Sequence, residues 1–155
     1  MRPLRITAKV DYAVRAAIEL ADADRTTPIK GDRIAEAQDI PMKFLENILS
    51  EMKRSGLVRS QRGAEGGYAL AKPAAEITIA SVIREVDGPL AEVRGLRPHE
   101  TTYSGVAEHL PQVWVAVRAA IRAVLDETTL AHVLRGELPP HVVKLLDTPE
   151  AWLPR

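Results

Sequence analysis

Apolar residues recur at helical intervals in the first third of the chain. Over residues 8–22 they return every three or four positions and predict a first helix, with Thr7 as its N-cap. Residues 30–38 are predicted to form a short second helix. A third helix is predicted from Pro41, which suits the first helical position, to about Ser55. Because only a tight turn separates the second and third helices, they form a helix-turn-helix candidate.

After the third helix the pattern changes to strict alternation. Gly56 is suited to end the helix, and residues 57–62, LVRSQR, alternate as a strand does. Residues 68–72, YALAK, are a second predicted strand, joined to the first by the glycine-rich turn of residues 63–67. A hairpin directly after the third helix predicts the wing of a winged helix.

The second half of the chain is again predicted to be helical, with one long loop. Residues 79–86 form an amphipathic helix, and residues 89–104 lack periodicity. A long helical segment then ends near Glu127. Pro111 inside it either kinks the helix or marks where the regular part starts. A short helix over residues 128–135 follows.

The long helical segment carries apolar residues with the spacing 4-3-4-3-4, which resembles a coiled coil. This stripe consists of Val106, Leu110, Val113, Val117, Ala120 and Val124. The fold class predicted from all these elements is mainly α with a small β-hairpin wing. The predicted regions are a winged helix-turn-helix at 1–88, a loop at 89–104, a long-helix region at 105–136 and a proline-rich, loosely ordered tail at 137–155.

Composition supports a helical core and an uneven distribution of charge. Apolar residues make up 46% of the chain but aromatic residues only 4%, which favours helices built on aliphatic side chains. The net charge is zero, yet residues 1–72 hold 13 Lys and Arg against 10 acidic residues. The basic excess is densest at Lys53, Arg54, Arg59 and Arg62. A local basic patch of this kind is what phosphate binding requires.

The sequence also lacks the features of several other classes of protein. No stretch of about 18 apolar residues could span a membrane, and the charged N-terminal region does not resemble an export signal, so we expect a cytoplasmic location. The chain has no cysteine, which excludes disulfides and thiolate ligands. Because no catalytic arrangement or cofactor fingerprint is found, we expect neither an enzyme nor a bound cofactor.

The third helix has two unlike sides. Its buried stripe is predicted to be Leu45, Ile48, Leu49 and Met52. The other side offers Lys43 to guanine or phosphate, Glu46 to cytosine and Asn47 to adenine. Phe44 suits a thymine methyl group or a sugar, and Arg54 at the far end suits phosphate. Such side chains predict a helix that reads the major groove.

An ordinary solvated helix is the alternative, with Met42 and Phe44 as core residues. The hairpin favours nucleic acid instead, because Arg59 and Arg62 lie on its first strand. Its glycines are expected to leave backbone amides unshielded; they are Gly63, Gly66 and Gly67. A glycine-rich tip that carries arginine can follow the phosphates or enter the minor groove.

Three stretches of the sequence form a specific combination within residues 6–90. They are ITAKVDYAVRAAIELA, then IAEAQDIPMKFLENILSEMKRSGLVRSQRGAEGGYALAK, and IASVIREVDGPL. The sequence resembles the bacterial winged-helix transcriptional regulators typified by IscR, NsrR and CymR. This resemblance implies a homodimer on a palindromic double-stranded DNA operator, with 1–88 as the DNA-binding domain and 105–136 as the dimerisation region.

The resemblance also assigns individual positions. Lys43, Phe44, Glu46 and Asn47 match the positions at which the family reads bases, and Arg62 matches a wing arginine that enters the minor groove. The full set of candidate DNA contacts is Lys30, Met42, Lys43, Phe44, Glu46, Asn47, Arg54, Arg59, Arg62, Gly63, Gly66 and Gly67. The apolar stripe of the long helix is the candidate dimer interface.

The loop at 89–104 departs from the family. Cluster-binding members carry three cysteines there and this chain carries none, so we expect a regulator without an iron–sulfur cluster. Asp11, near the position from which some relatives supply a ligand, is expected to pair with Arg15, four residues on. A solvated loop is favoured over a metal site built from His99, Glu100 and His109.

Two questions of function stay open at the level of sequence. A small-molecule effector could bind between the long helix and the loop, near Trp114 and Tyr103, unless Trp114 belongs to the dimer core. The sequence favours a DNA-binding regulator that acts as a repressor. The alternative is a protein-interaction regulator of the same fold, which would have no need for the basic run at 53–62.

Overall fold

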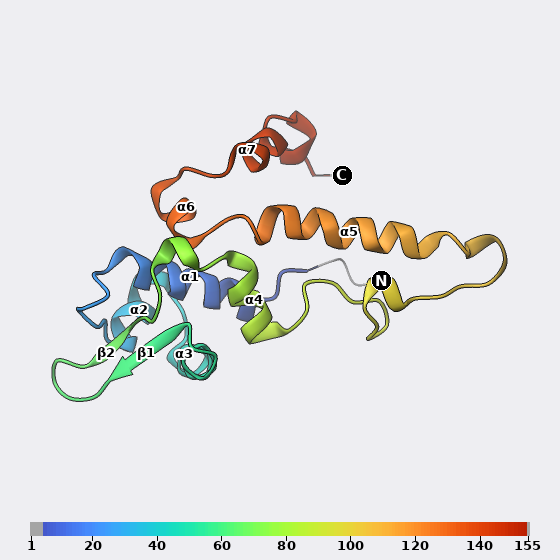
Figure 1. Ribbon diagram of the computed structural model, residues 1–155. Helices are drawn as coiled ribbons and strands as arrows, with labels where there is room; N and C mark the ends of the chain where they lie inside the picture. Colours follow the sequence, from blue (N-terminus) through green and yellow to red (C-terminus); the bar gives the residue numbers. More distant parts are fainter. Residues whose placement is uncertain (1–4, 155) are drawn as a thin grey trace.

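The first half of the chain folds as a winged helix around one central helix. The computed structural model describes residues 5–154, and Figure 1 shows the arrangement of its elements. In order, they are α1 (Ala8–Asp22), α2 (Gly31–Gln38), α3 (Met42–Arg54), β1 (Val58–Gln61), β2 (Gly67–Leu70), the 3-10 turn η1 (Ala74–Glu76) and α4 (Ile79–Asp87).

The central helix α1 is capped as predicted and packs through small side chains. The Thr7 hydroxyl accepts a hydrogen bond from the Val10 amide at 3.2 Å. Ala13, Ala16 and Ala17 are buried on the face that packs against the rest of the domain. Because alanine has only a methyl group, α4 and α3 can approach α1 closely. The aliphatic, nearly ring-free core expected from composition is the result.

The turn between α2 and α3 is tight, and it corrects one detail of the prediction. α2 ends at Gln38, and its C-cap Asp39 is left-handed with a φ of 50°. Ile40 then enters the core with 4% of its surface exposed. Pro41 is the N-cap of α3 and not its first helical residue, because its ψ of 128° is extended. Its carbonyl accepts from the amides of Phe44 and Leu45 at 3.0 and 3.1 Å.

The wing, defined here as residues 58–70, is a two-stranded antiparallel hairpin. Its register runs from Val58 opposite Leu70 to Gln61 opposite Gly67, so each strand is shorter than predicted. The inner pair, Val58 and Leu70, is buried, and the tip projects outward. Tyr68 also exchanges two backbone hydrogen bonds with Ile29, at 2.7 and 2.8 Å. The wing is therefore fixed to the segment that precedes α2.

The second half begins with the loop of residues 89–104, which lies against a long helix. It contains the 3-10 turn η2 (Pro98–Glu100), which packs on α5 (Leu110–Leu125). Pro111 lies in the first turn of α5, so the regular helix starts there and is not kinked. Val106 falls outside α5, in the 3-10 turn η3 (Gly105–Ala107), and is fully exposed. The apolar stripe of the helix therefore starts at Leu110.

The segment between α4 and α5 leads away from the winged helix in Figure 1, and α5 runs back toward it. α6 (Leu130–Arg135) packs on α1 and buries Leu130. Its start is tied to the segment before α4, because the Leu130 amide donates to the Ile77 carbonyl at 2.9 Å. No helix in residues 5–154 is long and apolar enough to cross a membrane.

The tail contains more regular structure than the sequence predicts. It contains α7 (Pro140–Leu146) and the 3-10 turn η4 (Pro149–Trp152). Val142 is buried, and the Trp152 indole donates to the Leu146 carbonyl at 2.8 Å. Pro140 and Pro149 stand at the starts of these elements, where a missing amide hydrogen costs nothing.

Candidate nucleic-acid interface

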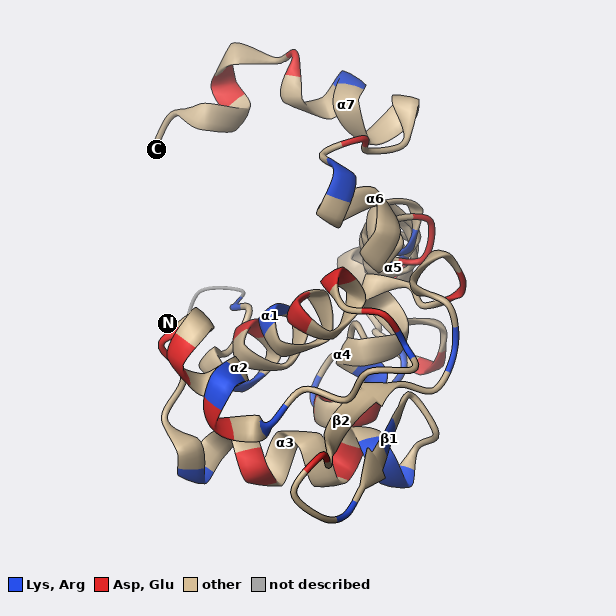
Figure 2. Cartoon of the chain, turned by 90° about the vertical axis from the view of Figure 1, so that its left-hand side faces the viewer, with Lys and Arg blue, Asp and Glu red and all other residues tan. Residues whose placement is uncertain are grey.

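Helix α3 has the two predicted sides. Its buried residues are Leu45, Ile48, Leu49 and Met52, each at most 1% exposed. Lys43, Glu46, Asn47 and Arg54 are all exposed. Figure 2 shows α3 and the wing on the same side of the molecule, at the bottom of the view. The structure thus brings the predicted base-reading side chains beside the predicted wing.

Phe44 and Met42 are neither core residues nor isolated on the surface. Phe44 is 56% exposed and Met42 is 38% exposed. The Phe44 ring lies 6.3 Å from the ring of Tyr12 on α1, tilted by 44°. The Arg15 guanidinium lies 5.0 Å from the centre of the Tyr12 ring and also pairs with Asp11 at 3.0 Å, as predicted. Phe44 is therefore held in place on one side and open on the other.

A groove of about 350 Å³ runs along α3 next to the start of α1. It is lined by Lys9, Phe44, Asn47, Ile48, Ser50, Glu51 and Arg54. Lys9 Nζ pairs with Glu51 Oε1 at 3.0 Å, while Glu51 Oε2 is buried and has no partner among residues 5–154. Sequence reasoning missed Lys9, because its contact with α3 joins residues 42 positions apart.

The tip of the wing projects Arg62 into solvent. Arg62 and Gly63 are exposed, and the φ of Gly63 is 102° with open space around it. Within residues 5–154, the Arg62 side chain forms no hydrogen bond or ion pair. Its guanidinium is therefore free to reach an external acceptor.

The other two wing glycines have a structural reason for being glycine. Gly66 is buried, and its amide donates to the Gly63 carbonyl at 3.0 Å. A Cβ at Gly67 would lie 2.4 Å from the Ile29 carbonyl oxygen, and φ there is 149°. The expectation that both leave amides unshielded is corrected for Gly66, whose amide is already bonded. These residues let the wing pack against the segment before α2.

Lys30 and Arg59 lie on either side of this packing. Lys30 is exposed and lines a groove shared with Ala64, Glu65 and Gly66, so it stands close to the wing tip. Arg59 is turned elsewhere, because its guanidinium donates to the backbone carbonyl of Arg25.

The predicted effector residues are Tyr103 on the loop and Trp114 on α5, and they are arranged differently from the prediction. The Trp114 indole donates to the Tyr103 hydroxyl at 3.1 Å, and Arg94 lies 5.7 Å from the centre of the Tyr103 ring. These two aromatic side chains contact each other, and neither lines the pocket between α4, the following loop and α5.

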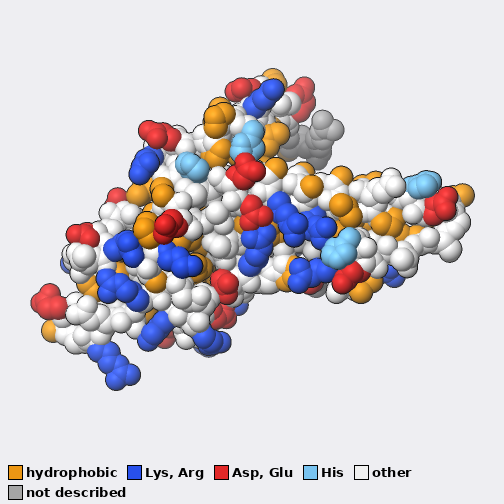
Figure 3. All heavy atoms as spheres, in the orientation of Figure 1, with side chains coloured by type: hydrophobic (Ala, Val, Ile, Leu, Met, Phe, Trp, Pro, Cys, Tyr) orange, Lys and Arg blue, Asp and Glu red, His pale blue; other side chains and the backbone are white. Residues whose placement is uncertain are grey.

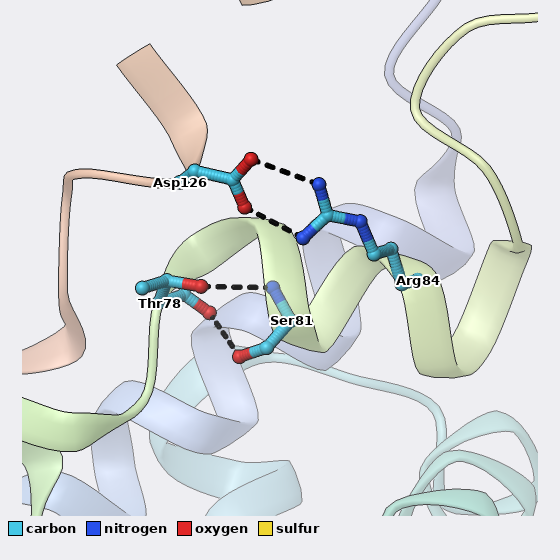
Figure 4. A network of polar contacts seen from close by, with 4 residues as sticks. All are labelled: Thr78, Ser81, Arg84 and Asp126. Atoms are coloured by element: carbon cyan, nitrogen blue, oxygen red, sulfur yellow. Dashed lines mark hydrogen bonds and ion pairs between the residues drawn. The ribbon is translucent and has the colours of Figure 1, made fainter. Parts of the chain in front are cut away.

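An ion pair between α4 and the end of α5 is a further feature that the sequence did not reveal. Arg84 donates twice to the Asp126 carboxylate, at 2.6 and 2.9 Å (Figure 4). These hydrogen bonds hold the pKa of Asp126 below its ordinary value, and the charge of Arg122 acts in the same direction. Thr78 caps α4 below this pair by accepting from the Ser81 amide at 3.1 Å.

The chain is similar to a known family of proteins. The Rrf2 family model, described as an iron-dependent transcriptional regulator, matches residues 6–136. The chain belongs to the Rrf2 family. A Mycobacterium tuberculosis protein that bears the name of an HTH-type transcriptional regulator is 51% identical over 144 residues, covering 93% of this chain and 89% of that protein. CymR of Bacillus subtilis is 33% identical over 127 residues, covering 82% of this chain and 87% of CymR.

Solved structures of Rrf2 regulators share the fold. The global cysteine regulator CymR of B. subtilis superposes with a TM-score of 0.74 at 31% identity, covering 86% of this chain and 98% of that one. IscR of T. potens superposes with a TM-score of 0.67 at 30% identity, covering 98% of this chain and 93% of that one. The relatives are transcriptional regulators and not enzymes, so the winged-helix fold and the class of function predicted from sequence are confirmed.

The iron named in the family description does not fit the donor set of this chain. The sequence has no cysteine, so no thiolate can ligate a cluster. Asp11 pairs with Arg15, and Glu100 accepts from the Arg97 amide at 2.8 Å. His99 contacts Arg118 at 2.9 Å. Within residues 5–154 no group of three or more His, Asp or Glu side chains could hold a metal ion.

Proposed function

We propose that this chain is a sequence-specific DNA-binding repressor that acts as a homodimer on a palindromic operator, without an iron–sulfur cluster. The observation that carries the proposal is the position of the exposed α3 face beside the unpaired Arg62 of the wing. A helix and a wing on one side of a molecule can enter a major groove and the adjacent minor groove of the same duplex.

The chemistry of each side chain supports a division of labour. Glu46 and Asn47 lie near the start of α3, where a recognition helix meets base edges, and their acceptors and donors match cytosine and adenine. Lys43 suits guanine or phosphate, and Arg54 suits phosphate. Arg62 reads the narrow minor groove through its electrostatic potential.

The state of α5 supports a homodimer. None of its residues is buried in the single chain. Of the predicted apolar stripe, Val113 (51%) and Ala120 are exposed, and Leu110, Val117 and Val124 are half-buried. A 16-residue helix with a partly uncovered apolar stripe gains stability by packing against a second copy. Two wings related by twofold symmetry then require a palindromic site.

A repressor needs fewer surfaces than an activator. Occupying an operator blocks transcription without any contact to the polymerase. The polar and basic surface of the wing and α3 is accounted for by DNA alone, and the small-molecule signal would act on the half of the chain around α5.

The test is binding of the purified chain to fragments of its own genome, followed by sequencing of the retained DNA and footprinting. We expect retention of a few fragments that share a palindrome, and loss of this retention for Arg62→Ala. If the folded protein retains fragments without sequence preference, or none, the proposal is wrong and the protein-interaction alternative is supported.

A further inference from the structure

A pocket of about 230 Å³ lies between the end of α4, the loop that follows it and α5. Gly88 and Pro89 form part of its wall, and none of the described residues that line it is acidic. Four of the lining residues are arginines from three elements: Arg84, Arg97, Arg118 and Arg122. Figure 3 shows Lys and Arg side chains gathered below α5, beside a histidine. We call this site the arginine pocket.

The positive charge of the arginine pocket is only partly balanced. Arg84 pairs with Asp126. Arg118 contacts Nδ1 of His99, a side chain that carries no negative charge to offset it. Within residues 5–154 no ion pair includes the other two arginines. Because guanidinium groups stay charged at any physiological pH, four cations line a pocket without a carboxylate in its wall, and the acidic residues close by are Glu100, Asp126 and Glu127.

We propose that the arginine pocket binds a small anion with two or more negative charges, carried by carboxylate or phosphate groups. The planar guanidinium fork matches both groups through paired hydrogen bonds. The volume is below the roughly 300–1,000 Å³ of pockets that enclose drug-sized ligands, so a small metabolite fits better than a nucleotide. The carboxyl end of α4 opposes an anion with only about half a charge.

The arginine pocket is placed to influence the DNA-binding half. Arg84 and Gly88 also line a second groove, which includes Lys9, Glu51 and Arg54 beside α3. An anion that draws Arg84 from Asp126 loosens the contact between α4 and α5 and changes the charge next to that groove. We therefore expect the bound anion to alter the affinity for the operator, a consequence that rests on the proposed function.

Anion binding can be measured without DNA, by titration calorimetry of the full chain. The probes are citrate, succinate and pyrophosphate, at an ionic strength held constant with sodium chloride. We expect saturable binding of at least one probe at one site per chain, and the comparison of carboxylates with pyrophosphate identifies the preferred group. Arg97→Gln and Arg122→Gln are each expected to weaken binding by about tenfold or more, because each removes a charge-assisted contact.

Arg94→Gln is the matched control. Arg94 lies in the same loop but above the Tyr103 ring, and it does not line the arginine pocket. The Arg94→Gln variant should therefore bind the probe with the affinity of the wild type. Circular dichroism establishes that each variant is folded, and Arg97→Lys serves as a second variant that keeps the charge but loses the fork. No saturable binding of any probe, or equal affinities in all variants, overturns the proposal.

The coupling has a separate readout. At constant ionic strength, a saturating probe is expected to change operator affinity by roughly fivefold or more in the wild type, and not in Arg97→Gln. Operator binding that ignores a bound anion contradicts the coupling. A chain that binds the anion but no DNA contradicts the proposed function and leaves the arginine pocket standing.

Discussion

At the scale of single residues, the arginines near the wing differ in what they already contact. Arg59 donates to the Arg25 carbonyl, and Arg25 donates to the Ala71 carbonyl at 2.9 Å. Both therefore contribute to holding the wing against the loop before α2. Arg62 is exposed at the tip and has no such partner among residues 5–154. This difference predicts that Arg62 acts on DNA and that Arg59 acts on the structure.

Arg62→Ala should weaken operator binding by about 1–3 kcal/mol, because it removes a charged contact in the minor groove while leaving the fold unchanged. Fluorescence anisotropy at fixed salt measures the loss. Arg135→Ala, at an exposed position of α6, is the control and should leave affinity unchanged. Equal affinity of Arg62→Ala and the wild type contradicts the role of the wing.

Gly67→Ala should destabilise the protein by roughly 2–4 kcal/mol, because the new Cβ would lie 2.4 Å from the Ile29 carbonyl oxygen in a left-handed backbone. Gly63→Ala is the matched variant. Its φ of 102° is also unfavourable, but the space around it is open, so we expect a loss of about 1–2 kcal/mol. Urea unfolding compares the two, and equal losses would show that the close approach at Gly67 does not matter.

At the scale of elements, the sequence predicted those features that depend on interactions between residues close together in the chain. The helical stripe of α3, the Thr7 cap and the hairpin of the wing all depend on neighbours within a few positions, and each is present, although burial does not alternate along β1 or β2. Contacts between distant positions were not predictable in this way. Lys9 with Glu51 and Arg84 with Asp126 each join residues 42 apart, and no local periodicity encodes them.

The structural roles of individual prolines and glycines also depend on contacts that the local sequence does not reveal. Pro140 and Pro149 start short helical elements, although prolines in a tail ordinarily indicate irregular structure. Gly66 serves packing rather than an exposed amide, because whether a glycine is buried depends on what folds over it. For the candidate site, the exposed residues of α3 and Arg62 were predictable from sequence, whereas the arginine pocket required the loop and α5 to be placed in space.

The ion pair between α4 and α5 should contribute to stability in a pH-dependent manner. Because the pKa of Asp126 is lowered in the folded state, the pair stabilises the fold above about pH 4, and this contribution disappears as the pH falls through the lowered pKa. The side chains are 38% and 34% exposed, so the expected cost of Asp126→Asn is only about 0.5–1 kcal/mol at pH 7.

Thermal unfolding of Asp126→Asn and the wild type at pH 7 and at pH 3 checks this. The difference in unfolding temperature between the variant and the wild type should be smaller at pH 3 than at pH 7. Glu137→Gln, at an exposed position after α6, is the control for removing one negative charge. A difference that is the same at both pH values contradicts the assigned pair.

At the scale of the whole molecule, the proposed homodimer predicts an interface along the apolar stripe of α5. Val117→Asp should weaken the dimer by roughly 100-fold, because a carboxylate would be buried in an apolar interface. Ala119→Asp introduces the same charge on another side of α5, at a 100° step per residue, and should leave the dimer intact. Analytical ultracentrifugation over a range of concentrations distinguishes them, and equal dissociation constants would move the interface elsewhere.

The central claim is that a dimer of this chain recognises a particular DNA sequence. Selection from a pool of random double-stranded DNA by the purified protein tests it most directly. We predict enrichment of a sequence with twofold symmetry, whose half-sites lie about one helical turn apart, and no such enrichment by Glu46→Ala combined with Arg62→Ala. A folded, dimeric wild-type protein that enriches no sequence over the starting pool would contradict the claim.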